Sequence, residues 1–126
     1  MGQPIVHYEI IGEDPEDLQR FYGELFGWEY SIGDTVSRSV SAPGRYGFIE
    51  GVANGGTQPN GGVAGGAGFE RRLLFYVGVD DVEAALAKAE ELGGRREFGP
   101  DGRPGELVVG RFSDPAGNEV GVAGTR

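Results

Sequence analysis

The chain has 126 residues, of which 11 are Lys or Arg and 20 are Asp or Glu, so that its formal net charge at pH 7 is −9. This length suits one domain with a sizeable core and is too short for two independent ones. The acidic balance disfavours nucleic acid and anionic membranes as partners. The absence of cysteine excludes disulfide scaffolds, thiolate metal sites and cysteine nucleophiles. Since no apolar run approaches the roughly 20 residues that cross a bilayer, we expect a soluble, cytoplasmic protein.

The first two predicted elements are a strand and a helix. Residues 4–11 are rich in β-branched and aromatic side chains and end at Gly12, which is typical of a buried strand. Asp14 can then cap a helix, Pro15 fits its first position, and Gly27 can end it in a left-handed conformation. Apolar residues recur at helical spacing between these signals, at Leu18, Phe21, Tyr22, Leu25 and Phe26.

Three short strands are predicted next, at residues 28–32, 36–42 and 46–53. Residues 54–68 are dominated by glycine and carry no large side chain, so we interpret them as a flexible linker. A phosphate-binding loop is disfavoured, because neither a following helix start nor a Gly-Lys-Ser/Thr ending accompanies the glycines.

The same order of elements then begins again. Residues 72–79 predict a strand, Asp80 or Asp81 can cap a second helix, and Gly93 follows the helix. The apolar stripe of this helix consists of Val82, Ala85, Leu86, Ala89 and Leu92. Three more strands are predicted at residues 95–98, 107–112 and 118–123.

The repetition predicts a single α+β domain built from two βαβββ modules. Module one spans residues 1–53, the linker residues 54–68 and module two residues 69–126. The apolar helix residues that we expect to pack against the sheet are Leu18, Phe21, Leu25, Val82, Leu86 and Leu92.

These segments resemble the vicinal-oxygen-chelate superfamily, which contains glyoxalase I, bleomycin-resistance proteins and extradiol dioxygenases. The resemblance is carried by Val6-His-Tyr-Glu-Ile10, by residues 14–28 and 79–86, and by Phe112-Ser-Asp-Pro-Ala-Gly-Asn118, and it covers nearly the whole chain except the linker. It implies that two βαβββ modules form a curved mixed sheet around a concave small-molecule site, which a second chain often completes. We therefore expect a homodimer with a small-molecule ligand. The resemblance leaves the reaction open, because one fold hosts many chemistries.

Metal-dependent members of this superfamily hold an ion with one residue from the first and one from the last strand of each module. The matching positions here are His7 and Glu50 in module one and Leu74 and Gly121 in module two. Since Leu and Gly side chains bind no metal, the four-ligand set is incomplete and we expect no cofactor. A divalent metal held by His7 and Glu50 with further ligands is the alternative.

The candidate catalytic residues are His7, which is the only histidine, and Glu9, which shares its face of the strand by period-two alternation. We expect neighbouring carboxylates to raise the pKa of His7, so that it exchanges protons near neutrality. The alternative is that both side chains face water at the rim of the site.

The candidate ligand-binding residues are Trp28, Tyr30, Phe48, Leu74, Tyr76, Arg111 and Gly121. For Trp28 and Tyr30 the competing interpretation is core packing, which is common for aromatic residues after a helix. For Arg111 it is an ion pair with a neighbouring carboxylate.

Three functions remain open at this point. The leading one is a small-molecule-binding protein or metal-independent enzyme of the superfamily. The second is a metal-dependent lyase or dioxygenase, in which His7 and Glu50 are joined by Glu9, Glu119 or a ligand from a partner chain. The third is a non-catalytic interaction module.

Overall fold

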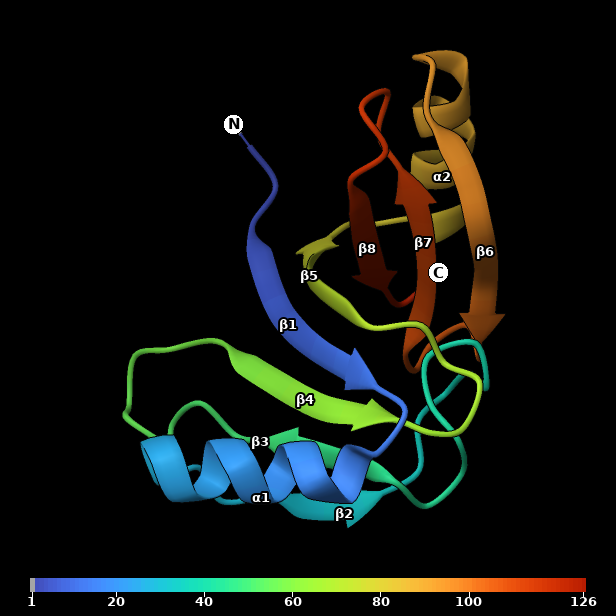
Figure 1. Cartoon of the computed structure of the whole chain (residues 1–126). Coiled ribbons are helices and arrows are strands. Elements are labelled where there is room, and N and C mark those ends of the chain that lie inside the picture. Colours follow the sequence, from blue (N-terminus) through green and yellow to red (C-terminus); the bar gives the residue numbers. More distant parts are fainter. Residues whose placement is uncertain (1) are drawn as a thin grey trace. The chain divides into compact units, whose positions relative to one another are not determined.

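The computed structural model describes residues 2–126, in which eight strands and two helices follow the order β1–α1–β2–β3–β4–β5–α2–β6–β7–β8 (Figure 1). The predicted α+β class with two βαβββ modules is thereby confirmed. The chain divides into two compact units, one of residues 7–73 and one that combines residues 2–6 with residues 74–126. Neither helix of the described part is long and apolar enough to cross a membrane.

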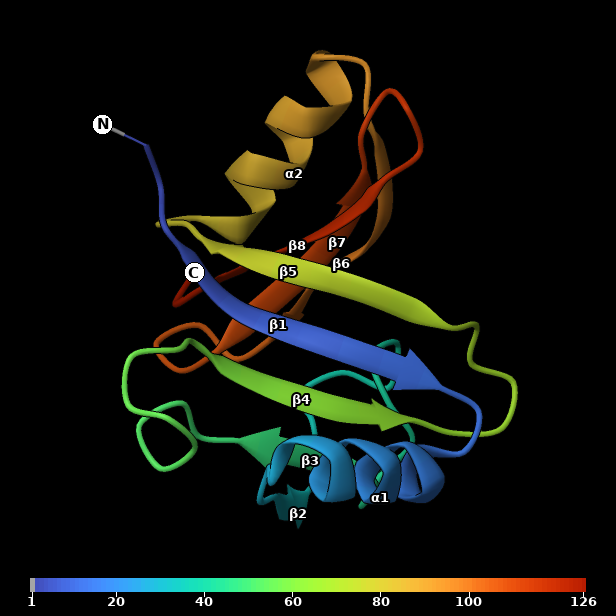
Figure 2. The same cartoon turned by 60° about the vertical axis from the view of Figure 1, so that its left-hand side comes forward.

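The unit of residues 7–73 contains most of β1 (Ile5–Gly12), α1 (Pro15–Phe26), β2 (Ser31–Gly33), β3 (Tyr46–Ile49) and β4 (Asn60–Gly65). Its strands lie in the order β2-β3-β4-β1, in which β1 and β4 are parallel and the other pairs antiparallel. The helix α1 packs against β4 and β3 on one face of this sheet (Figure 2).

Strand β4 contradicts the interpretation of residues 54–68 as a flexible linker. Residues Asn60–Gly65 form a central strand, and all of them except Asn60 are buried. The predicted strand at residues 36–42 is wrong as well, because this segment is irregular, with a turn at residues 38–40. Module one therefore has the predicted number of strands. Its last strand, however, begins at Asn60, whereas the last predicted strand began at Tyr46.

The glycines of β4 make room for tyrosine rings of neighbouring strands. A Cβ atom at Gly61 would collide with the ring of Tyr8, and one at Gly62 would collide with the ring of Tyr46. The backbone of β4 thus supplies the ladder hydrogen bonds, while its neighbours supply the apolar cover. A strand of this kind lacks the β-branched and aromatic residues by which strands are predicted.

The orientation of α1 also differs from the prediction. Gln19 is buried, and its side-chain amide donates to the carbonyl oxygens of Arg45 at 3.2 Å and Val63 at 2.8 Å. Since this polar anchor faces the sheet, Phe21 and Leu25 are turned outward, with 50% and 59% of their surface exposed. The expected packing of Phe21 and Leu25 against the sheet is therefore wrong, and that of Leu18 is only partial.

The second unit contains most of β5 (Arg72–Gly78), α2 (Val82–Glu91), β6 (Arg95–Gly102), β7 (Val108–Ser113) and β8 (Glu119–Gly124). Its strand order is β5-β8-β7-β6, with β5 and β8 parallel and the other pairs antiparallel. Four of these elements were predicted with nearly these bounds, whereas β6 was predicted only over residues 95–98 and extends to Gly102. Beneath α2, the core consists of Val82, Leu86, Val108 and Val122. Leu92 lies outside this core and is 69% exposed, contrary to the expectation.

Candidate functional site

A chain of three polar side chains lies on the sheet of residues 7–73. The hydroxyl oxygen of Tyr46 is 2.7 Å from Nε2 of His7, and the same hydroxyl donates to Oε2 of Glu9 at 2.8 Å. The His7 and Glu9 atoms themselves are 3.9 Å apart, so the tyrosine bridges them. Glu9 is only 5% exposed and Tyr46 only 8%, which makes this a largely buried cluster with a carboxylate at its inner end.

The backbone pattern explains why these side chains meet. Alternation along β1 puts His7 and Glu9 on one face and Tyr8 on the other. Glu9 of β1 is in register with Gly62 of β4. The ring of Tyr46, a residue of β3, covers Gly62 and so reaches Glu9. On the opposite face, a Cβ atom at Gly12 would touch Leu18 of α1. The polar cluster therefore lies on the face of the sheet that α1 does not cover.

The charge state of Glu9 determines the tautomer of the imidazole. With Glu9 as a carboxylate, the hydroxyl of Tyr46 donates to Glu9, and its oxygen accepts from His7. In that state Nε2 of His7 carries the hydrogen, and Nδ1 is the unprotonated nitrogen of the neutral ring. In this arrangement Nε2–H of His7 donates to the hydroxyl oxygen of Tyr46, and the O–H of Tyr46 donates to the carboxylate of Glu9.

The expected rise in the pKa of His7 is wrong. Burial lowers the pKa of His7 from 6.5 to about 4, because removing the ring from water disfavours the imidazolium. The sequence placed Glu9 correctly beside the histidine but could not show how strongly the ring is buried. His7 is thus neutral at pH 7.

Phe48 is the candidate ligand-binding residue that lies beside this cluster. Its ring centroid is 6.4 Å from that of His7, and the two planes differ by 15°. Tyr46 and Phe48 are two residues apart in β3, so alternation puts them on the same face. The phenyl ring of Phe48 therefore gives the polar cluster an apolar neighbour.

Trp28 and Tyr30 lie on the side of α1 instead. The ring of Trp28 is 5.7 Å from Tyr22 and 5.2 Å from Phe26, both on the helix. The ring of Tyr30 lies next to Gly23 of the helix. The packing interpretation accounts for both aromatic residues, and we leave them out of the candidate site.

Glu50 does not hold the position from which a metal ligand was expected. It follows β3, is exposed, and is not on the last strand of the module, which is β4. On β4 the residue in register with Glu9 is Gly62. Within residues 2–126 there is no group of three or more His, Asp or Glu side chains that could hold a metal ion.

The four candidate residues of the second unit share one face of its sheet. Leu74 and Tyr76 are buried on β5. Tyr76 is in register with Gly121 of β8, and its ring covers that glycine. A side chain at Gly121 would collide with that ring, which explains the glycine. Arg111 lies on this face too, because it is in register with Gly121.

The guanidinium of Arg111 is already surrounded by protein groups. It lies 5.0 Å from the ring centroid of Phe98, and its Nε is 3.8 Å from Oε2 of Glu119. A cation held over an aromatic ring beside a carboxylate is stabilised in place. The ion-pair interpretation of Arg111 fits this arrangement.

Tyr46 is the member of this polar cluster that the sequence analysis missed. Its position two residues before Phe48 was the available signal, since both would lie on one face of a strand. The bridge to His7 and Glu9 could not be read from the sequence, because it depends on the register of β3, β4 and β1.

One of the comparisons with known proteins identifies the family. The sequence model described as a glyoxalase-like domain matches residues 11–123. No curated protein matches the chain by sequence.

Solved structures with the same fold share little sequence. A Streptomyces coelicolor methylmalonyl-CoA epimerase variant in complex with 2-nitronate-propionyl-CoA is 15% identical, with a TM-score of 0.67 over 98% of this chain and 94% of that one. A hypothetical protein from Bacillus halodurans is 14% identical, with a TM-score of 0.68 over 100% and 96%. The methylmalonyl-CoA epimerase of Mycobacterium tuberculosis is 12% identical, with a TM-score of 0.65 over 97% and 87%. At these identities the likeness concerns the fold.

Proposed function

Because the chain belongs to the family of glyoxalase-like domains, we propose that it binds a small organic molecule and transfers a proton on it without a metal ion. The observation that carries this proposal is the buried chain of His7, Tyr46 and Glu9 on the sheet face opposite α1. Buried polar networks of this kind, with a perturbed histidine at one end, are typical of functional sites.

The chain of hydrogen bonds allows a proton to be taken up without creating a buried cation. A ligand proton binds to the lone pair of Nδ1, the Nε2 proton passes to Tyr46, and the tyrosine proton passes to Glu9. The imidazole is neutral before and after this step, and the negative charge of Glu9 is the one that disappears. Since burial disfavours the imidazolium, this route is favoured over a simple protonation of His7.

The donor set supports metal independence. Metal-dependent members of the superfamily would need ligands from first and last strands, and Leu74 and Gly121 supply none in the second unit. In the first unit Gly62 of the last strand, in register with Glu9, lies under Tyr46 and supplies no ligand either. One imidazole and one carboxylate fall short of the three or more protein ligands of ordinary catalytic metal sites, and Tyr46 already bridges them.

The ligand that fits this site has a weakly acidic proton next to a flat apolar part. The proton would face the acceptor nitrogen of His7, and the apolar part would lie against Phe48. Two of the solved structures with this fold are methylmalonyl-CoA epimerases, one of them in complex with 2-nitronate-propionyl-CoA. We do not assign their substrate to this chain.

The test uses protein that has been treated with EDTA and transferred to D2O. Small carbonyl compounds and carboxylic acids with an acidic C–H bond are added, and NMR follows both C–H exchange and the resonances of His7, the only histidine. We expect a subset of compounds to shift His7 and to exchange, and Tyr46→Phe to slow the exchange by about 100-fold or more.

Tyr30→Phe is the matched control, since it removes a tyrosine hydroxyl on the α1 side that has no hydrogen-bond partner among residues 2–126. The proposal fails if no compound shifts His7, or if exchange requires an added divalent metal.

A further inference from the structure

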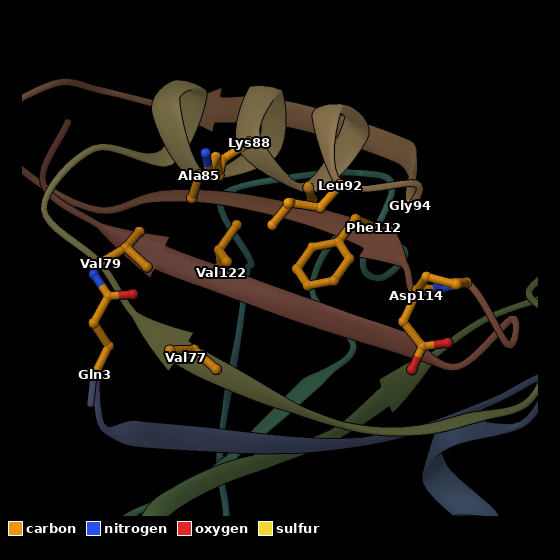
Figure 3. Close-up of a pocket in the computed structure, with 12 residues that line it drawn as sticks. Gln3, Val77, Val79, Ala85, Lys88, Leu92, Gly94, Phe112, Asp114 and Val122 are labelled. Atoms are coloured by element: carbon orange, nitrogen blue, oxygen red, sulfur yellow. The ribbon is translucent and has the colours of Figure 1, made fainter. Parts of the chain in front are cut away.

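The second unit contains a pocket that the proposed function does not use. It has a volume of about 380 Å³ and lies between α2 and the sheet, on the opposite face from Tyr76 and Gly121. Its walls include Val77 of β5, Phe112 of β7 and Val122 of β8 (Figure 3). This volume falls within the range of small-molecule sites, and its lining is mainly apolar, as is usual for them.

The internal repeat explains why this space is empty. Asp14 and Asp81 are the N-cap residues of α1 and α2, so residues at the same distance from each cap are equivalent. The fourth and eighth residues after the cap are Leu18 and Tyr22 in α1, and Ala85 and Ala89 in α2.

In the first unit, these two large side chains fill the space beneath the helix. Leu18 lies against Gly12 of β1, and the ring of Tyr22 stacks on Trp28 at 5.7 Å. In the second unit, Ala85 and Ala89 line the pocket and leave it open. The pocket is therefore lined by two alanines at the helix positions where α1 has a leucine and a tyrosine.

The charged groups at the pocket are placed asymmetrically. Lys88, the only lysine of the sequence, lies at one end and Asp114 at the other (Figure 3). The carboxylate of Asp114 accepts from the backbone of Ala116 and from Asn118, and these hydrogen bonds lower its pKa. Asp114 is thus a fixed negative charge that repels an anion from its end.

The ammonium group of Lys88 is available to a ligand. Its ion pair with Glu91 is 3.5 Å long, and both side chains are more than half exposed, at 62% and 69%. Exposed pairs of this kind contribute little and exchange readily with water. Gln3, whose side chain also lines the pocket, adds an amide group that can donate to a carboxylate.

We infer that this pocket is a second ligand site, which takes a monocarboxylate with an apolar chain or ring. The apolar part lies over Phe112 and Val122 beneath α2, and the carboxylate lies toward Lys88, away from Asp114.

Octanoate is a suitable probe, and octan-1-ol and octylammonium are its uncharged and cationic counterparts. In a titration followed by amide NMR, octanoate is expected to shift the signals of Ala85, Ala89, Phe112 and Val122. Octan-1-ol should bind more weakly and octylammonium more weakly still. If octylammonium binds as well as octanoate, or if octanoate leaves these four signals unchanged, the assignment is wrong.

Variants separate the pocket from general surface binding. Ala85→Leu combined with Ala89→Tyr introduces the residues of α1 and should abolish the octanoate shifts, whereas Ala87→Leu on the exposed side of α2 should not. Lys88→Gln should weaken the binding of octanoate by about three- to fivefold and leave the binding of octan-1-ol unchanged. Arg20→Gln on α1 should change the affinity for neither compound. Retained binding in the filled double variant would overturn the inference. Should that variant not fold, equal affinity of Lys88→Gln and the parent for octanoate would overturn it instead.

Discussion

Tyr46 is the residue on which the candidate site depends, because its one hydroxyl group contacts both His7 and Glu9. Tyr46→Phe leaves the buried carboxylate without this donor and is expected to lower the free energy of unfolding by about 1–3 kcal/mol. Tyr30→Phe removes a buried hydroxyl that makes no hydrogen bond within residues 2–126 and should change stability by less than about 0.5 kcal/mol or raise it. Urea unfolding of both variants measures the difference. Equal losses of stability in the two variants would show that the hydrogen bonds of the Tyr46 hydroxyl do not stabilise the fold.

The buried His7 predicts a defined loss of stability in acid. Its pKa is about 4 in the folded protein and 6.5 when exposed. Between these values the unfolded chain binds more protons, so the free energy of unfolding falls as the pH drops from about 6.5 to about 4. This histidine alone accounts for a loss of up to about 3 kcal/mol over that window.

The measurement compares the parent with His7→Gln, whose amide can still donate to Tyr46. We expect the stability of the parent to fall more steeply between pH 6.5 and pH 4 than that of the variant. Parallel curves in this window would contradict the lowered pKa.

At the scale of elements, the glycines of β4 are required by the tyrosine rings packed on them. Gly62→Ala would push a methyl group into the ring of Tyr46, and we expect a loss of about 2 kcal/mol or more together with a change in the His7 resonances. Gly33→Ala in β2 has nothing within 4 Å of the new methyl group and should be nearly neutral. Thermal unfolding of the two variants tests this. A neutral Gly62→Ala would mean that the Tyr46 ring can move aside at no cost.

The elements differ in how far the sequence could predict them. Both helices were predicted correctly because their starts are local signals, and the side chains of Asp14 and Asp81 do accept from backbone amides in the first turn. Strand β4 was missed because its stability comes from the rings of Tyr8 and Tyr46, which are distant in the sequence. The outward turn of Phe21 was missed for the same reason, since a buried Gln19 bonded to Val63 sets the orientation of α1.

The candidate site was predicted in part. His7, Glu9 and Phe48 do share one sheet face, since Glu9 and Phe48 are both in register with Gly62 of β4. Alternation along the strand predicted this for His7 and Glu9. Tyr46 was missed because its contacts depend on strand register, and Trp28 and Tyr30 pack against α1, as the competing interpretation of core packing has it.

At the scale of the whole molecule, the expected homodimer stays a prediction. Phe21, Leu25 and Phe26 expose 50%, 59% and 57% of their surface on one helix. Clustered exposed apolar residues favour contact with another protein surface, and a second copy is the partner that the resemblance suggests. Light scattering should give twice the mass of the 13.3 kDa chain. Leu25→Glu should shift the protein toward the monomer, while Val52→Glu, in a turn and 73% exposed, should not. A monomeric parent at micromolar concentration would contradict the prediction.

The central claim is that His7, Tyr46 and Glu9 form one hydrogen-bonded chain in which a neutral histidine carries its hydrogen on Nε2. Nitrogen-15 NMR of the imidazole of the only histidine, recorded from pH 8 to pH 3, measures this directly. We predict the Nε2–H tautomer at pH 7, a pKa of about 4, and no change of the His7 signals on adding zinc to EDTA-treated protein. An imidazolium at pH 6, an Nδ1–H tautomer, or a His7 signal that moves with zinc would contradict the account.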